Sequence, residues 1–394
     1  MSNSLANVYN NVSYALHLHS AAMTVLQEQT STGSRVNRVS DDPSAAYRIM
    51  GLSTQQRTLT NYTDNLSEIV SLLDLSSTAI EEVASALTET RVRLTQIAGG
   101  IYSEDARQRA AEGINDILEQ VVSLANTQHM GQYLFGGGDT TSAPYTVERT
   151  DGKITSVTYE GSDENRSVEV APGVNSSAFF VGDDVFRSDD RGELIFLGPT
   201  GAKSGTGTST VRGDSWLTVT GTAGNYTLSI DDGQTTFNTD GTDTNLAVTD
   251  STTGEILYVD TTAITGAGVD LVRAPGTYDI FSTLISIRDI LENEKGLSGG
   301  QLRDLQDSSL VSLEEVNGLI VQTEVAVGAR VGFLDNLKDS LTNLKYDAED
   351  ETTRLQEADI AQIAIDLSRR EILYQMSLSI AGRLMSVSLL DFLE

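Results

Sequence analysis

The chain has 394 residues, a formal net charge of −30 and no cysteine. So negative a charge disfavours binding to nucleic acid or to an acidic membrane surface, because nothing offsets repulsion from the phosphates. The lack of cysteine excludes disulfides, thiolate metal sites and cysteine nucleophiles. With 39% hydrophobic and 21% charged residues, the chain can bury a core, and its length predicts roughly two to four domains.

The N-terminal region is predicted to be one amphipathic helix over residues 4–32, with apolar residues at three- and four-residue spacing. We expect the helix to end before Gly33, because glycine tolerates the left-handed conformation at a helix C-terminus. Residues 1–26 lack a charged segment followed by an apolar core, so any export is expected to proceed without a cleaved signal peptide. No apolar run approaches the roughly 20 residues that span a membrane.

A linker over residues 34–42 leads into a second, much longer helix. Asp42 followed by Pro43 is a strong helix start, because aspartate caps the first turn and proline has no N–H to leave unpaired. From Leu59 to Ile97 the helix carries a heptad seam, a repeat of apolar positions in which ten of twelve are apolar. Such a seam indicates a rod of roughly 58 Å that buries a narrow stripe against partner helices and ends near Gly99.

The composition then changes from helical to β-rich. A helix over about 104–130, ended by Gly131, precedes a region from 139 to 276 that is rich in Thr, Gly, Ser and Asp, and Gly136–Gly138 forms a hinge between them. We expect antiparallel strands at 155–159, 193–197, 216–220, 226–230 and 256–259. Hairpin turns are expected at Asp151-Gly152, Asp232-Gly233 and Asp240-Gly241. Gly198-Pro199 is where this insert could divide into two pieces.

The helical pattern returns after Gly276, with helices expected over 280–295, 301–346 and about 355–390. The second of them carries another heptad seam from Leu313 to Leu344, with eight of ten positions apolar. Each seam needs a partner and is the other's obvious candidate. The predicted fold class is mainly α, with long N- and C-terminal helices paired as a coiled-coil or helix-bundle rod and an antiparallel β-rich domain inserted at its tip.

The terminal helices are amphipathic but have no compact domain of their own, so alone they would be marginally stable. Their apolar faces must pair with each other or with the same faces of neighbouring molecules. The polar linker residues could pair within the chain or between subunits. The candidate assembly contacts are Leu5, Val8, Val12, Leu26, Arg35, Asn37, Arg38, Asp41, Asp42, Ile360, Leu367, Tyr374, Leu378, Met385, Leu389 and Leu390. The expected domains are terminal helices (1–42 with 350–394), a helix bundle (43–138 with 277–349) and a β-rich outer domain (139–276).

No group of residues predicts catalysis, a cofactor or a metal. His17 and His19 are too close for the i, i+4 spacing of a helical zinc site. The acidic runs at 231–233 and 240–243 could offer oxygen ligands to Ca²⁺, but they lack the twelfth-position glutamate of an EF-hand, so turns are the better interpretation. Gly136–Gly138 is not followed by the Lys-Ser/Thr of a phosphate loop. We therefore expect a protein that is not an enzyme and binds no cofactor.

Three segments resemble the flagellin family. The segment Ser-Thr-Gly-Ser-Arg-Val-Asn-Arg-Val-Ser-Asp-Asp-Pro at 31–43 is similar to the version found in the hook–filament junction branch of that family. Filament subunits usually carry Ser-Ser-Gly-x-Arg-Ile-Asn followed by Asp-Asp-Ala. Gln-Tyr-Leu-Phe-Gly-Gly at 132–137 and the ending Ser-Leu-Leu-Asp-Phe-Leu at 388–393 are also similar to the junction branch. The resemblance covers about 1–138 and 277–394, and the β-rich insert lies outside it.

The resemblance implies a structural subunit of the bacterial flagellum. Its terminal helices would form an inner coiled-coil layer, with the helix bundle outside it and the insert projecting outward. A ring of about eleven copies would join a hook-associated protein on the hook side to flagellin on the filament side. The resemblance also implies an extracellular location, type III export without a cleaved signal peptide, and a cytosolic export chaperone over the C-terminal helix.

Two other functions stay open at this point. The chain could be a filament flagellin, although the Asp-Asp-Pro and Tyr-Leu-Phe-Gly segments argue against it. It could also be a surface adhesin or glycan-binding protein whose helices serve only as a stalk, which a glycan array on residues 139–276 would test.

Overall fold

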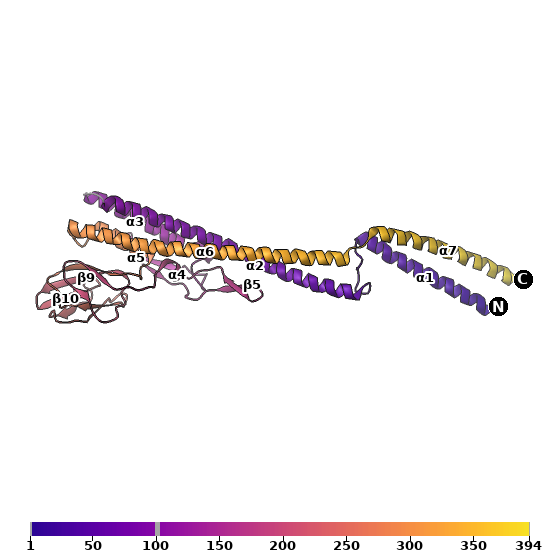
Figure 1. Ribbon diagram of the computed structural model, residues 1–394, viewed down its shortest axis with the longest axis horizontal. Helices are drawn as coiled ribbons and strands as arrows, with labels where there is room; N and C mark the ends of the chain where they lie inside the picture. Colours follow the sequence, from indigo (N-terminus) through magenta and orange to yellow (C-terminus); the bar gives the residue numbers. More distant parts are fainter. Residues whose placement is uncertain (1, 99–102, 394) are drawn as a thin grey trace. The chain divides into compact units, whose positions relative to one another are not determined.

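The computed structural model describes the backbone of residues 2–98 and 103–393, and within them all side chains except those of residues 2–6, 8, 9, 98 and 384–393 (Figure 1). The chain forms two compact units: Met1–Asn65 with Leu337–Glu394, and Leu66–Asn336. The predicted fold class is confirmed, since long N- and C-terminal helices enclose a central antiparallel β-rich region. Among the described residues, no helix is both long enough and apolar enough to cross a bilayer.

The first unit consists of two pairs of helices. Helix α1 (Ser2–Thr32) lies beside α7 (Ile360–Leu393). The start of α2 (Pro43–Ala98) lies beside the end of α6 (Gly299–Gln356), where Arg48 pairs with Glu351 and the Gln56 amide donates to the Thr352 hydroxyl at 3.2 Å. The first turns of α2 thus contact the last turns of α6, as in an antiparallel helix pair.

The C-terminal helix boundaries differ from the prediction. Helix α6 does not stop at 346 but continues to Gln356, and the last helix begins at Ile360 instead of 355. No glycine or proline interrupts residues 345–356. Ala348, which is buried, extends the buried face where the predicted seam residue Leu344 is 49% exposed. Leu334, Leu341 and Ala348 stay buried at seven-residue intervals, so the helix continues with one buried position in each heptad.

The caps of α1 and α2 agree with the prediction. Gly33 follows α1 with a φ of +67°, and its N–H donates to the Gln29 carbonyl at 2.9 Å. One oxygen of Asp42 accepts from the Ala45 N–H at 3.0 Å and from the Ser44 hydroxyl at 2.8 Å, and the other accepts from Arg35 at 3.0 Å. These bonds, led by the one from Ala45, lower the pKa of Asp42 to about 2.

In the second unit the heptad seam is the helical core. Every seam position of α2 from Leu66 to Ile97 is buried, including Ser76 and Thr90, whose hydroxyls donate to backbone carbonyls one turn earlier. On α6 the buried seam positions are Leu313, Val316, Ile320, Val327 and Leu334. Arg91 pairs with Glu314 at 2.6 Å, so the two helices remain antiparallel neighbours here. The seams therefore have partners, as predicted.

Two shorter helices pack together in this unit, and both end earlier than predicted. Helix α3 is Glu104–Ala125 and α5 is Ile280–Glu292. After α3, Met130 and Gly131 have φ of 50° and 80° and form the turn between β1 (Gln128–His129) and β2 (Gln132–Tyr133). Gly131 thus serves a two-residue hairpin and does not end a helix. Asn293, with a φ of 56°, ends α5 before Gly296.

The β-rich region contains two groups of strands, all paired antiparallel. The first group holds two hairpins, β3 (Tyr145–Thr150) with β4 (Lys153–Tyr159) and β5 (Ser167–Ala171) with β6 (Val174–Ser177), followed by the short α4 (Gly182–Phe186). The turn Asp151-Gly152 has φ of 53° and 84°, as expected for a tight hairpin.

The second group packs two sheets over one core. The five-stranded sheet contains, in order, β11 (Phe237–Thr239), β10 (Asn225–Ser229), β9 (Gly213–Thr222), β14 (Gly268–Ala274) and β7 (Ile195–Leu197). The three-stranded sheet contains β12 (Leu246–Thr249), β13 (Ile256–Asp260) and β8 (Lys203–Ser204). Leu217 and Leu228 from one sheet share a buried cluster with Val248 and Leu257 from the other. Because β7 already belongs to this group, the two groups divide before it and not at Gly198-Pro199.

A buried polar network ties the sheets to the helices. Arg273 of β14 and Asp214 of β9 have side chains only 5% and 4% exposed and form an ion pair at 3.0 Å. Tyr278 and Ser286 also donate to Asp214, at 2.8 and 2.7 Å, and Arg273 reaches Ser308 of α6. Burial, together with the Asp214 charge, raises the pKa of Tyr278 far above its ordinary value. Asp214 therefore connects β9, β14, α5 and α6.

Replacing Asp214 by asparagine should destabilise the second unit by about 3–5 kcal/mol, because the buried Arg273 would keep its charge and lose its counter-ion. The measurement is chemical denaturation followed by circular dichroism. Asp189→Asn is the matched control, since the ion pair from Asp189 to Arg212 has side chains 75% and 38% exposed and should change stability by less than about 0.5 kcal/mol. Equal effects of the two variants would contradict this account.

The Asp42 cap should make the start of α2 sensitive to acid. The folded pKa of about 2 lies below the ordinary 3.8, so the cap stabilises α2 above that ordinary value and is lost as the pH falls toward 2. Hydrogen exchange of the Ala45 and Ala46 amides should therefore speed up over that range. Asp42→Asn, which caps without titrating, should flatten the response; the same acid dependence in this variant would refute the assignment.

Candidate assembly surfaces

The two connections between the terminal helices and the longer helices lie side by side. Ser34 and Glu357 form an isolated antiparallel bridge. The Arg35 N–H donates to the Gln356 carbonyl at 2.6 Å, and the Ala358 N–H donates to the Gly33 carbonyl at 3.1 Å. Backbone hydrogen bonds thus join the two connections, so neither can change conformation without breaking bonds to the other.

The polar linker residues predicted as contacts all have partners within the chain. One Asp41 oxygen accepts from the Asn37 N–H at 3.1 Å and the Arg38 N–H at 2.8 Å. The Arg38 guanidinium pairs with Glu28 at 3.1 Å, and Arg35 pairs with Asp42. Each of these residues therefore has a partner within the chain, which is one of the two possibilities that the sequence left open. Arg35, Arg38 and Asp41 remain exposed, and their contact with a neighbouring subunit stays a prediction.

The predicted apolar contacts on the terminal helices divide between partly buried and exposed positions. Val12, Leu26, Leu367 and Tyr374 are half-buried. Ile360 and Leu378 are 46% and 47% exposed. The side chains of Leu5, Val8, Met385, Leu389 and Leu390 lie outside the described ones. In this structure α1 and α7 therefore cover only part of each other's apolar surface.

The structure also exposes apolar residues that the three- and four-residue spacing missed. Large side chains more than two-fifths exposed are Tyr14, Leu18 and Val25 on α1, and Ile365, Ile372, Met376 and Ile380 on α7. They lie beside the predicted stripe, so each helix is apolar over more than one face. A broad apolar surface on a two-helix pair is typical of a binding surface. Counting apolar residues around the whole helix, instead of along one stripe, would have found them.

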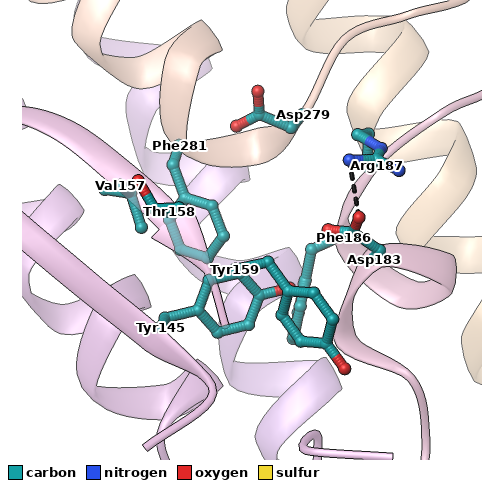
Figure 2. A pocket seen from close by; sticks show the side chains of 9 residues that line it. All are labelled: Tyr145, Val157, Thr158, Tyr159, Asp183, Phe186, Arg187, Asp279 and Phe281. Atoms are coloured by element: carbon teal, nitrogen blue, oxygen red, sulfur yellow. Dashed lines mark ion pairs between the residues drawn. The ribbon is translucent and has the colours of Figure 1, made fainter. Parts of the chain in front are cut away.

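An aromatic pocket lies in the second unit, at the base of the β-rich region (Figure 2). Its volume is about 260 Å³, and its lining residues are Tyr145, Val157, Thr158, Tyr159, Asp183, Phe186, Arg187, Asp279 and Phe281. The Tyr145 ring lies 4.7 Å from Phe281 and 5.2 Å from Tyr159 between centroids. Such offset and edge contacts are typical of a packed aromatic cluster.

The carboxylates of this pocket already have structural roles. Asp183 pairs with Arg187 at 2.5 Å, and Asp279 caps α5 by accepting from the Ser282 N–H at 2.7 Å. Burial raises the pKa of both aspartates and of Tyr145. Both carboxylates thus help to position α4 and α5. We therefore interpret the pocket as a gap between packed aromatic side chains.

The other motifs considered for ligand binding form turns. Asp231 accepts from the Thr235 N–H at 2.9 Å, and Asp240 accepts from the Thr242 N–H at 3.0 Å, so both carboxylates bond to nearby backbone. A side chain on Gly137 would meet the Ser162 carbonyl at 2.2 Å, which explains that glycine by close packing. Over residues 2–98 and 103–393, no three His, Cys, Asp or Glu side chains are placed to hold a metal ion together.

Comparisons with known proteins match these helical regions to flagellar proteins. Residues 4–140 match the family model described as the bacterial flagellin N-terminal helical region. The flagellar hook-associated protein 3 of Escherichia coli (strain K12) is 31% identical over 162 residues, 41% of this chain and 49% of that protein, so the chain spans about half the length of this relative. The polar flagellin C of Vibrio parahaemolyticus is 21% identical over 379 residues, 90% of this chain and 89% of that protein.

A solved structure shares the fold. The crystal structure of the flagellar hook-associated protein-3 from Legionella pneumophila aligns with a TM-score of 0.54 and 17% identity, over 78% of this chain and 98% of that one. The match of residues 4–140 to the flagellin N-terminal family model agrees with the resemblance that residues 31–43 and 132–137 predicted.

Proposed function

We propose that this protein is a structural subunit of the bacterial flagellum that joins the hook to the filament. The observation that carries the proposal is the Ser31–Pro43 segment, whose Asp-Asp-Pro ending is similar to the junction branch of the flagellin family. The similarity to a relative named flagellar hook-associated protein 3 supports it. We propose no catalytic role, because the function of such a subunit is to assemble.

Assembly follows from the exposed apolar surface of α1 and α7. These helices bury too little surface on each other to offset the conformational entropy lost on ordering them, unless neighbouring copies cover the rest. Residues 1–42 with 350–394 would form the inner layer, 43–138 with 277–349 the surrounding bundle, and 139–276 the outer domain. The sixteen predicted contact residues belong to the first of these layers and to the linker at 35–42.

The partners in this proposal follow the family resemblance. About eleven copies would form a ring, with a hook-associated protein on one side and flagellin on the other. The subunit would reach the outside of the cell through type III export without a cleaved signal peptide. A cytosolic chaperone would cover the apolar face of α7 before export.

A filament flagellin is the second candidate, because the polar flagellin C match extends over 90% of this chain. The two functions differ in copy number and place. A junction subunit occurs only at the base of each filament, whereas a filament subunit occurs along its whole length.

Deletion of the gene separates these functions. A junction subunit predicts cells with complete hooks and no filaments by electron microscopy, and flagellin released into the medium. Filaments that are present but shorter or altered in shape would support the filament subunit instead. Unchanged flagella would overturn both proposals.

Leu378→Asp should leave the folded monomer intact and block its incorporation into the flagellum. Leu378 is 47% exposed in the monomer, so burying the rest of it in the assembly would contribute roughly half of the 1.5–3 kcal/mol of a full leucine burial, and losing about 1 kcal/mol lowers affinity roughly fivefold before the cost of burying the new carboxylate. The measurement is the amount of protein in purified hook–filament complexes beside circular dichroism of the monomer. Ser379→Asp, at the adjacent exposed position, is the control, and normal incorporation of Leu378→Asp would refute the proposal.

A further inference from the structure

The packing of the aromatic pocket leaves one buried polar atom without a bond. The Tyr145 side chain is 5% exposed, and its hydroxyl is one of three buried side-chain atoms in the described part of the chain that have no hydrogen-bond partner. Figure 2 shows this ring pointing from β3 toward Tyr159 and Phe186, whose ring centroids lie 5.2 and 5.8 Å away. A buried hydroxyl that loses its bond to water costs free energy unless another polar group replaces that water. The Tyr145 hydroxyl is therefore available to a polar group of a ligand.

The charges that line the pocket do not balance. Asp183 and Asp279 contribute two carboxylates, and Arg187 contributes one guanidinium. Asp183 pairs with Arg187 at 2.5 Å, whereas Asp279 forms no ion pair among the described residues and caps α5 through Ser282. Burial raises the pKa of both aspartates and outweighs the favourable charge of Arg187. A cation bound in the pocket would offset the remaining negative charge.

The pocket leads from the surface into the aromatic cluster. Its lining runs from the exposed Thr158 to Tyr145 and to Phe281, which is 3% exposed. Its volume of about 260 Å³ is slightly below the ~300–1,000 Å³ of pockets that hold drug-sized ligands. Aromatic rings attract cations through their faces and also offer apolar surface to an aliphatic chain. The pocket therefore suits a short aliphatic chain that carries one positive charge.

We propose that this pocket binds a primary alkylammonium group, either of a free amine or of a lysine side chain on a partner protein. Such a group has three N–H donors, and the pocket has three matching acceptors in Asp183, Asp279 and the Tyr145 hydroxyl. Both carboxylates keep this capacity, because an ionised carboxylate has about four lone-pair sites and its present bonds use only some of them.

Other ligand classes match these groups less well. A quaternary ammonium ion has no N–H to donate to the Tyr145 hydroxyl or to the carboxylates. A neutral sugar could bond to the hydroxyl but would leave the negative charge without a counter-ion. All nine lining residues belong to the compact unit Leu66–Asn336, so the site is complete within that unit. The proposal is independent of the hook–filament function.

The first test removes the hydroxyl that has no partner. The full chain is titrated with n-butylammonium chloride at low ionic strength, and binding is followed by saturation-transfer difference NMR. We expect saturable, roughly millimolar binding, as for so small a ligand. Tyr145→Phe should weaken it about tenfold, because a hydrogen bond to a charged group is lost. Tyr226→Phe is the control, since Tyr226 is 4% exposed and lies outside the pocket, and it should bind butylammonium normally.

Stability distinguishes a ligand role of Tyr145 from a structural one. Its hydroxyl has no bond within the described protein, so Tyr145→Phe should unfold at the same denaturant concentration as the unchanged chain or at a higher one. A loss of binding without a loss of stability is the result that the proposal predicts. Unchanged binding would show that water alone satisfies the hydroxyl and would overturn the proposal.

The second test removes the charge and keeps the helix cap. Asp279→Asn retains a side-chain oxygen for the Ser282 N–H and should weaken butylammonium binding about tenfold or more. Asp189→Asn, whose side chain is 75% exposed, makes the same change in net charge and should have no effect. Equal effects of the two variants would show attraction to the acidic chain as a whole and would overturn the proposal.

Two further ligands identify the source of the ammonium group. Binding of Nα-acetyl-lysine methylamide as tight as that of butylammonium would indicate a lysine side chain of a partner, and binding of butylammonium alone would indicate a free amine. Tetramethylammonium should bind at least tenfold more weakly than butylammonium. Equal binding of tetramethylammonium, or no saturable binding of either primary amine at millimolar concentration, would contradict the proposal and leave the hook–filament function as it stands.

Discussion

The burial of two heptad seams is the interaction on which the rest of the structure depends. In the second unit, Leu66, Leu73, Ile80 and Val83 of α2 are fully or almost fully buried, and an antiparallel α6 lies beside them. A seam of this length lets two segments far apart in sequence form one rod without a globular core. The β-rich region lies between α3 and α5 in the sequence, and these two helices pack against each other.

In the proposed function the terminal helices are the part of the chain that binds neighbouring copies. Helices α1 and α7 leave residues such as Tyr14, Ile365 and Ile372 more than half exposed, and α2 and α6 also expose apolar side chains outside their buried seams. In the proposed assembly, the free energy of burying these exposed side chains would be gained when copies associate. Two features would restrict such association between copies. The connections near Ser34 and Glu357 are hydrogen-bonded to each other, and the strongly negative net charge of each copy disfavours contacts that include no positively charged group.

The sequence predicted the features that depend on local or periodic signals. The Asp42 cap and the glycine after α1 follow from backbone chemistry, and the seams follow from a repeat that is typical of paired long helices. It failed where a long-range contact decides. Leu344 fits the heptad yet is exposed, while Leu341 and Ala348 on either side of it are buried, and Gly131 fits a helix end yet forms a hairpin turn. The Asp214–Arg273 pair joins residues 59 positions apart, which no periodicity reveals.

The most direct test of the junction assignment is to locate the chain on the flagellum. A short epitope inserted at the exposed turn Ala223-Gly224 between β9 and β10, where a side chain on Gly224 would meet nothing within 4 Å, leaves the helices unchanged. Gold-labelled antibody should then mark one narrow band where the hook meets the filament in electron micrographs. Label along the whole filament would contradict the account and identify a filament subunit.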